Sequence, residues 1–131
     1  MSKVVKAVFT KNAPSPRAGI YNQAIIANGF IYTSGFTPVD PKVGKLVEGT
    51  VADRALQCLR NIGAVLDASG SSINHAVKVT VYLTSMNDFD IVNKVYSEFW
   101  GEVKPARACV AVKELPRGTD VEMDCVAMVS D

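Results

Sequence analysis

Two apolar, strand-like runs in the last third of the chain each carry a single charge, and the two charges are opposite. Arg107 interrupts the run at residues 105–112. Glu122 interrupts the run at residues 121–129 in the same way. A buried charge without a partner is costly, so each charge needs a reason. The Pro, Gly and Asp residues of the segment 113–120 are typical of a short connection. The pattern predicts antiparallel neighbouring strands whose Arg107 and Glu122 side chains face one pocket.

The first third of the chain predicts three strands. Alternating apolar residues in 1–9 indicate a first strand. The pair Asn28-Gly29 favours a two-residue turn, so residues 20–27 and 30–34 are predicted to form a hairpin. Residues 35–49 are predicted to be irregular.

The middle of the chain predicts a helix followed by a strand. Thr50 and Asp53 resemble a capping box, with Asp in place of the usual Glu. Apolar residues follow at helical spacing, namely Ala55, Leu59, Ile62 and Leu66. The helix is expected to end at Ser69-Gly70. Alternation between apolar and polar residues over 77–83 then predicts a strand with one buried face.

A second helix is predicted after this strand. Asp88 is its expected cap, and Gly101 and Pro105 end it. The predicted order β-ββ-α-β-α-ββ indicates an α+β fold, with a mixed sheet of about six strands and two helices on one face, forming a single domain over residues 1–131. The other face then needs a partner, which copies of the same chain in a closed symmetric assembly supply most simply.

Composition narrows the functional classes. The formal net charge is +1 and the basic residues are scattered, which argues against nucleic acid as a partner. No apolar stretch approaches the roughly 20 residues that span a bilayer, so no membrane is expected. Three cysteines cannot all pair within one chain, and none has metal-ligand spacing, which favours free thiols and no metal. A cytoplasmic location is expected, and a mitochondrial one is less favoured because the N-terminus lacks an Arg-rich presequence.

The segment Pro105-Ala106-Arg107-Ala108-Cys109-Val110, followed by Val121-Glu122-Met123, resembles the signature of the YjgF family, also called the Rid (reactive intermediate deaminase) family. Further matches are Asn12-Ala13-Pro14, Tyr21 with Gln23, Thr33-Ser34-Gly35, Val47-Glu48-Gly49, Asn61-Ile62, Val77 to Val81, and Asp88-Phe89 leading to Val92 to Tyr96. The resemblance implies a chorismate-mutase-like fold and a homotrimer with clefts between subunits. Its archetypal subgroup is the 2-iminobutanoate/2-iminopropanoate deaminases, which hydrolyse imino acids without a cofactor.

Such a reaction assigns distinct tasks to the two charged residues. The planar fork of Arg107 suits a substrate carboxylate, which it can bind through two hydrogen bonds. Glu122 suits a general base that activates water and then carries a proton to the leaving amine. The alternative is a structural ion pair between Arg107 and Glu122 that joins two strands.

The resemblance also implies substrate-binding roles for Tyr21, Ser34, Gly35, Phe89, Asn93 and Cys109. Tyr21 is expected to reach the cleft from a neighbouring subunit, or else to be a half-buried aromatic residue. Gly35 lets backbone approach a ligand closely, or simply ends a strand. Phe89 fits the core stripe of its helix equally well. Cys109 shares a strand face with Arg107 and serves as a pocket wall rather than a nucleophile.

Three positions depart from the family pattern. Ile20 and Asn22 stand in the first loop where the family commonly has Pro and Ser, and Phe36 replaces a common Gln. Phe36 is expected to narrow or reshape the entrance, so these departures bear on which imino acid is preferred.

Two other functions remain as alternatives. One is a regulatory or chaperone-like trimer, which the family links to translation inhibition and RNA cleavage, and the other is an enzyme that acts on another small carboxylate.

Overall fold

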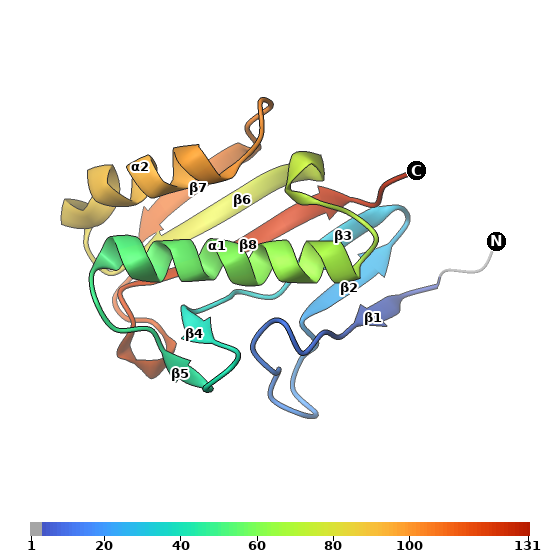
Figure 1. Ribbon diagram of the computed structural model, residues 1–131, viewed down its shortest axis with the longest axis horizontal. Coiled ribbons are helices and arrows are strands. Elements are labelled where there is room, and N and C mark those ends of the chain that lie inside the picture. The colour runs from blue at the N-terminus through green and yellow to red at the C-terminus, as the bar shows by residue number, and fades with distance from the viewer. Residues whose placement is uncertain (1–3) are drawn as a thin grey trace.

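Six strands form one sheet in the computed structural model, which describes residues 4–131. In chain order they are β1 (Lys6–Val8), β2 (Ala24–Ala27), β3 (Phe30–Thr33), β6 (Ala76–Leu83), β7 (Ala106–Ala111) and β8 (Val121–Met128). Their order across the sheet is β1-β2-β3-β8-β6-β7, and among the described strands β6 and β7 are the one parallel pair (Figure 1). Of the first predicted strand, residues 1–3 lie outside the described residues.

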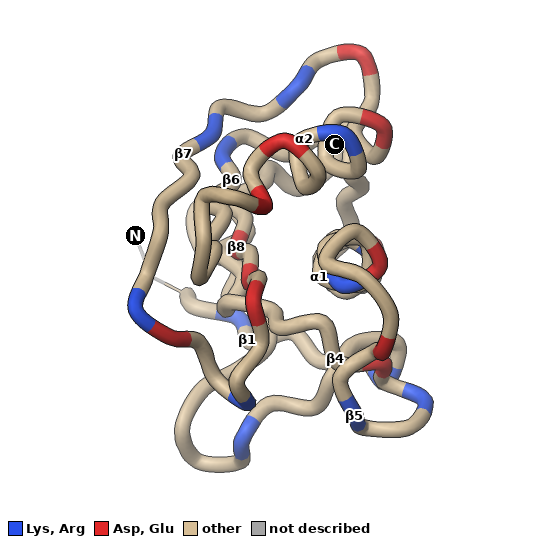
Figure 2. The backbone as a smooth tube through the Cα atoms, turned by 90° about the vertical axis from the view of Figure 1, so that its left-hand side faces the viewer, with Lys and Arg blue, Asp and Glu red and all other residues tan. Residues whose placement is uncertain are grey.

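Both helices cover the same face of this sheet. They are α1 (Val51–Ala68) and α2 (Phe89–Phe99), and Figure 2 shows them on one side of the strands. The capping box is confirmed, because Asp53 N donates to the Thr50 hydroxyl and Thr50 N donates to Asp53 Oδ2. Asp88 precedes α2, but its side chain makes no capping hydrogen bond. The α+β prediction with two helices on one face is confirmed.

The predicted hairpin is confirmed, although its first strand is shorter than expected. Asn28 and Gly29 have φ angles of 52° and 82°, the left-handed values that a two-residue hairpin turn requires. The strand begins at Ala24, so residues 20–23 form a loop. The segment 35–49 is not wholly irregular, because it holds a second small hairpin of β4 (Val39–Asp40) and β5 (Lys45–Leu46).

The prediction that the Arg107 and Glu122 strands are neighbours is wrong, because β6 lies between β7 and β8. A parallel β6–β7 pair needs a crossover, and α2 supplies it, which puts β7 at the edge of the sheet. The buried side chains of β8 fit its place between β3 and β6 in the middle of the sheet. Val121, Met123, Cys125 and Ala127 are each at most 1% exposed, and all face the helices.

The face of the sheet away from the helices is open and partly apolar. Tyr32 and Met128 are each 48% exposed there, and Val110 is 41% exposed. On the same face the Tyr82 hydroxyl donates to Asp124 Oδ2 at 2.8 Å. Within residues 4–131, neither helix has the length and apolar character needed to cross a bilayer.

Candidate functional site

Arg107 lies on the helix side of edge strand β7, where α2 holds its guanidinium. Nη1 donates to Asn93 Oδ1 at 2.7 Å. The guanidinium carbon lies 5.6 Å from the ring centroid of Phe89 and 4.8 Å from that of Tyr96. Positions 89, 93 and 96 are four and three residues apart, so they share one face of α2. We call Phe89, Asn93, Tyr96, Arg107 and Cys109 the Arg107 half-site.

Cys109 shares the face of Arg107, as predicted, and packs against the hydrophobic core. Burial raises the pKa of its thiol, and the nearby Arg107 charge opposes that rise only in part. The thiol is therefore protonated at neutral pH, which suits a wall of the site and not a nucleophile.

Glu122 lies on the opposite face of the sheet, in a pocket of about 600 Å³ whose lining includes Tyr21, Gly35 and Arg117. A β-carbon on Gly35 would lie 3.0 Å from Glu122 Cδ and Oε2, so the space that Gly35 leaves is taken by the carboxylate. Burial, and secondly the charge of Asp124, raise the pKa of Glu122. We call Tyr21, Gly35 and Glu122 the Glu122 half-site.

The loop that carries Tyr21 is fixed by hydrogen bonds that the sequence patterns did not single out. The Ser34 hydroxyl donates to the backbone oxygen of Asn22, so Ser34 orients the loop and is not among the residues that line the pocket. Gln23 is 1% exposed, and its amide bonds to backbone groups of Thr10, Ala13 and Pro14. The only sequence signal for Gln23 was its place in the family resemblance.

Two arginines that sequence reasoning did not assign also line the Glu122 pocket. They are Arg17 and Arg117. Arg117 has φ of 61°, a left-handed value that is uncommon for a residue with a side chain. Their charges make the rim of this pocket attractive to an anion.

Arg107 and Glu122 do not face one pocket within a chain. Arg107 aligns with Val79 of β6, and Glu122 aligns with Tyr82, three positions further along. Two strand spacings and three residues separate their Cα atoms by about 14 Å, and the side chains point to opposite faces. An Arg107–Glu122 ion pair that joins two strands of one chain is therefore also excluded, and within residues 4–131 the one salt bridge joins Arg54 to Asp120.

The expectation that Phe36 narrows the entrance is wrong, whereas Ile20 does lie at the candidate site. Phe36 is 5% exposed and belongs to the core, where its backbone pairs with Met123. An aromatic ring at this position fills the interior and does not narrow the entrance. Ile20 is 71% exposed and lines the Glu122 pocket, so this departure lies at the candidate site.

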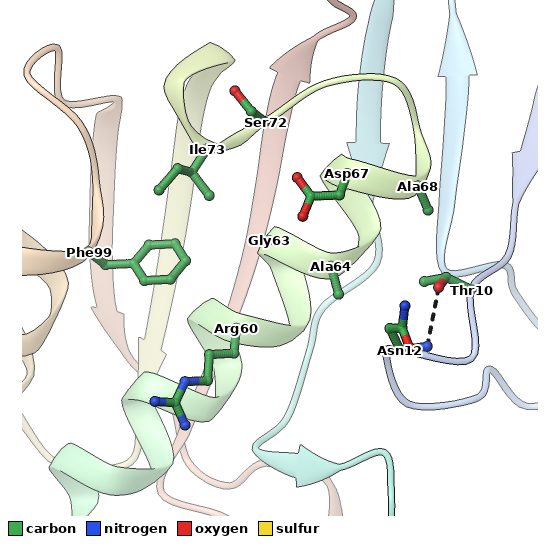
Figure 3. Close-up of a pocket in the computed structure, with 10 residues that line it drawn as sticks. All are labelled: Thr10, Asn12, Arg60, Gly63, Ala64, Asp67, Ala68, Ser72, Ile73 and Phe99. Carbon is green, nitrogen blue, oxygen red and sulfur yellow. Dashed lines mark hydrogen bonds between the residues drawn. The ribbon is translucent and has the colours of Figure 1, made fainter.

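A larger hollow of about 710 Å³ lies beside the outer surface of α1 and contains none of the predicted site residues. Figure 3 shows its lining side chains on two sides of the helix, with Phe99 and Ile73 on one side and Thr10 and Asn12 on the other. Among the described residues, no cluster of His, Cys, Asp and Glu side chains has the geometry to hold a metal ion.

Known proteins resemble this chain over nearly its whole length. The family model described as Endoribonuclease L-PSP matches residues 10–129. A RutC family protein of Pyrococcus horikoshii is 48% identical over 122 residues, which are 93% of this chain and 96% of that protein. The 2-iminobutanoate/2-iminopropanoate deaminase of Mus musculus is 40% identical over 128 residues, which are 98% of this chain and 95% of that protein.

Solved structures share the fold as well as the sequence. The crystal structure of E. coli TdcF with bound serine superposes with a TM-score of 0.90 at 35% identity. The match covers 95% of this chain and 99% of that one.

Proposed function

Because the chain belongs to the endoribonuclease L-PSP family, which includes the Rid proteins, we propose that it hydrolyses reactive 2-imino acids to 2-keto acids and ammonia. The mouse relative is named for this reaction on 2-iminobutanoate and 2-iminopropanoate. The observation that carries the proposal is the state of Arg107. Its guanidinium is held by Asn93 and two rings, and makes no other hydrogen bond within residues 4–131.

The chemistry of a 2-imino acid matches the two half-sites. The substrate has a carboxylate next to an electrophilic C=N carbon. Arg107 has five N–H donors and uses one on Asn93, so its free donors can bind the carboxylate through two hydrogen bonds. Glu122 takes a proton from water as the oxygen attacks the C=N carbon. It returns that proton to nitrogen, which gives a tetrahedral adduct carrying a hydroxyl and an amino group. Glu122 then takes the hydroxyl proton and passes it to nitrogen as the C=O bond forms and the C–N bond breaks, so the 2-keto acid and ammonia leave.

The two half-sites require a second copy of the chain. Arg107 and Glu122 point to opposite faces of one sheet, so one molecule cannot bring both to the same substrate. The open face carries exposed apolar side chains at Tyr32, Val110 and Met128, which favours burial against another copy. In a closed homotrimer, Arg107 of each chain would meet Glu122 and Tyr21 of its neighbour.

The activity is tested by generating 2-iminopropanoate and 2-iminobutanoate in situ and trapping the surviving imine with semicarbazide. The wild-type protein is expected to lower the amount of trapped imine, and Arg107→Ala is expected to lose this effect. Equal trapping with and without the wild-type protein would refute the enzyme proposal.

The shared site is tested by mixing two inactive variants. Arg107→Ala and Glu122→Gln chains are co-expressed with different tags, and assemblies that carry both tags are purified. Every mixed trimer then has one complete site of three, so about one third of wild-type activity should return. Activity no higher than that of the single variants would show that each site lies within one chain. A sedimentation mass checks the trimer independently.

RNA cleavage, which the family's description names, fits these residues less well. It calls for an acid and a base at neutral pH and for a basic binding surface. The chain has one histidine and a net charge of +1. That histidine, His75, is exposed and its Nδ1 bonds to the Ser72 hydroxyl at 3.1 Å. Hydrolysis of a small anionic imine needs only the groups that the half-sites contain.

A further inference from the structure

Tyr96 is buried, although its side chain carries a polar hydroxyl group. The residue is 7% exposed, and its hydroxyl oxygen has no hydrogen-bond partner within residues 4–131. Burial raises the pKa of this hydroxyl to about 12, so it stays protonated. An unsatisfied buried hydroxyl costs about 1–3 kcal/mol, and Phe would fill the same space without that cost. Within one chain, the contact that Tyr96 makes with Arg107 is therefore through its ring.

The ring of Tyr96 lies against the Arg107 guanidinium. The distance of 4.8 Å from the guanidinium carbon to the ring centroid is the shorter of the two aromatic contacts, and the Phe89 distance is 5.6 Å. Both are within the roughly 6 Å at which a cation is attracted to a ring face. Asn93, between them on α2, holds Nη1. Three contacts from one helix face thus hold the guanidinium in place.

The geometry points to Tyr96 as a positioning residue for the carboxylate clamp: its ring, together with Phe89, orients the Arg107 guanidinium to receive the substrate carboxylate. This inference rests on the proposed function of Arg107. A planar fork binds a carboxylate through two bonds only when its plane is set correctly, so a misoriented guanidinium loses affinity without losing charge.

A purely structural role for Tyr96 makes a different prediction. Its ring also packs against Trp100, with centroids 5.7 Å apart, and belongs to the core cluster. If packing were its whole role, replacing it would lower stability and leave the KM of the folded enzyme unchanged. Positioning predicts a higher KM with little change in kcat, because the carboxylate contact is made in both the ground state and the transition state.

The experiment compares Tyr96→Phe, Tyr96→Leu and Phe89→Leu in the imine-trapping assay and in a thermal melt. Tyr96→Phe keeps the ring and removes the unpaired hydroxyl, so KM should stay near the wild-type value and the protein should melt no lower. Tyr96→Leu should raise KM about three- to thirtyfold, the range of cation–π energies. The inhibition constant of pyruvate, a 2-keto acid with the same carboxylate, should rise in proportion. Phe89→Leu should have a smaller effect in the same direction.

The outcomes separate this inference from the proposed function. If Arg107→Ala keeps full activity, the proposed function fails and the inference fails with it. If Arg107→Ala is inactive while both Leu variants keep the wild-type KM, only the positioning role of Tyr96 is overturned. Phe89 is not part of the buried core, so Phe89→Leu gives a folded test even if Tyr96→Leu does not fold. If Tyr96→Leu does not fold, an unchanged KM in Phe89→Leu contradicts the aromatic clamp.

Discussion

Gly35 and Glu122 are in direct contact, because a β-carbon on Gly35 would lie 3.0 Å from both Cδ and Oε2 of the Glu122 side chain. The backbone next to them is also tied together. Phe36 N donates to Met123 O at 2.7 Å, and Met123 N donates to Phe36 O at 3.1 Å. These bonds keep the two segments from separating, so a β-carbon at position 35 forces the Glu122 carboxylate to shift by a few tenths of an ångström.

We therefore expect Gly35→Ala to lower kcat about tenfold or more while the protein stays folded, because moving a general base out of place forfeits much of its 10² to 10⁴-fold contribution. Imine trapping and a thermal melt measure the two effects. Gly63→Ala is the matched control, since its β-carbon would meet Phe99 only at an ordinary 3.4 Å, within a helix. The control should keep wild-type activity. Equal kcat values for both variants would contradict the role of the contact.

Arg107→Lys should lose most activity even though the positive charge is kept. An ammonium group cannot offer a planar fork to a carboxylate, nor keep the same contact with Asn93 and the two rings. The measurement is kcat/KM by imine trapping, with a fall of about tenfold or more expected from losing one charge-assisted bond. Arg60→Lys, on an exposed position of α1, is the control. Near-normal turnover by Arg107→Lys would rule out the clamp.

The acidic limb of the kcat/KM profile should lie at a higher pH than an ordinary glutamate would give. Burial and the Asp124 charge raise the pKa of Glu122, and the base works only when ionised. Asp124→Asn removes one negative charge and keeps an acceptor for the Tyr82 hydroxyl. It should lower the pKa of Glu122 and move the acidic limb to lower pH. A limb that stays in place would show that another group controls it.

Glu122→Gln should abolish activity without lowering stability at neutral pH. The pKa of Glu122 is raised in the folded protein, so the ionised carboxylate favours unfolding at pH values above that pKa. Gln removes this cost, and the difference from the wild type should shrink as the pH falls through the folded pKa and should vanish below the lower pKa of the unfolded chain. Thermal melts at pH 4 and pH 7 measure the effect. A lower melting temperature for Glu122→Gln at pH 7 would contradict it.

The local signals in the sequence were reliable guides to local structure. Thr50 and Asp53 form the predicted capping box, and Asn28-Gly29 forms the predicted hairpin turn. Each of these depends only on residues a few positions apart. The two misplaced charges likewise identified Arg107 and Glu122 as side chains that need an explanation.

The spatial order of the strands was not predictable from those signals. The turn residues of 113–120 indicate a reversal of direction, which the structure has, but they do not say whether a third strand lies between. That depends on the α2 crossover, which places β6 between β7 and β8. The registers of the two strand pairs then put Arg107 and Glu122 on opposite faces. Gln23 was overlooked for a related reason, since a buried amide is recognised only by the backbone groups that it contacts.

The last prediction concerns the Arg54–Asp120 ion pair, which ties α1 to the turn before β8. Arg54 Nε and Nη2 donate to the two Asp120 oxygens at 2.8 and 2.7 Å, and Nη1 donates to Gly49 O. The hydrogen bonds from Arg54 lower the pKa of Asp120, so this stabilisation is present above the unfolded pKa and is lost as the pH falls through the lower, folded value. Asp120→Asn should cost about 1 kcal/mol of unfolding free energy at pH 7, because the pair is only partly exposed and loses one charge. Urea unfolding at pH 7 and pH 3 measures this cost. A cost that is equal at both pH values would show that packing, and not the ion pair, makes the contribution.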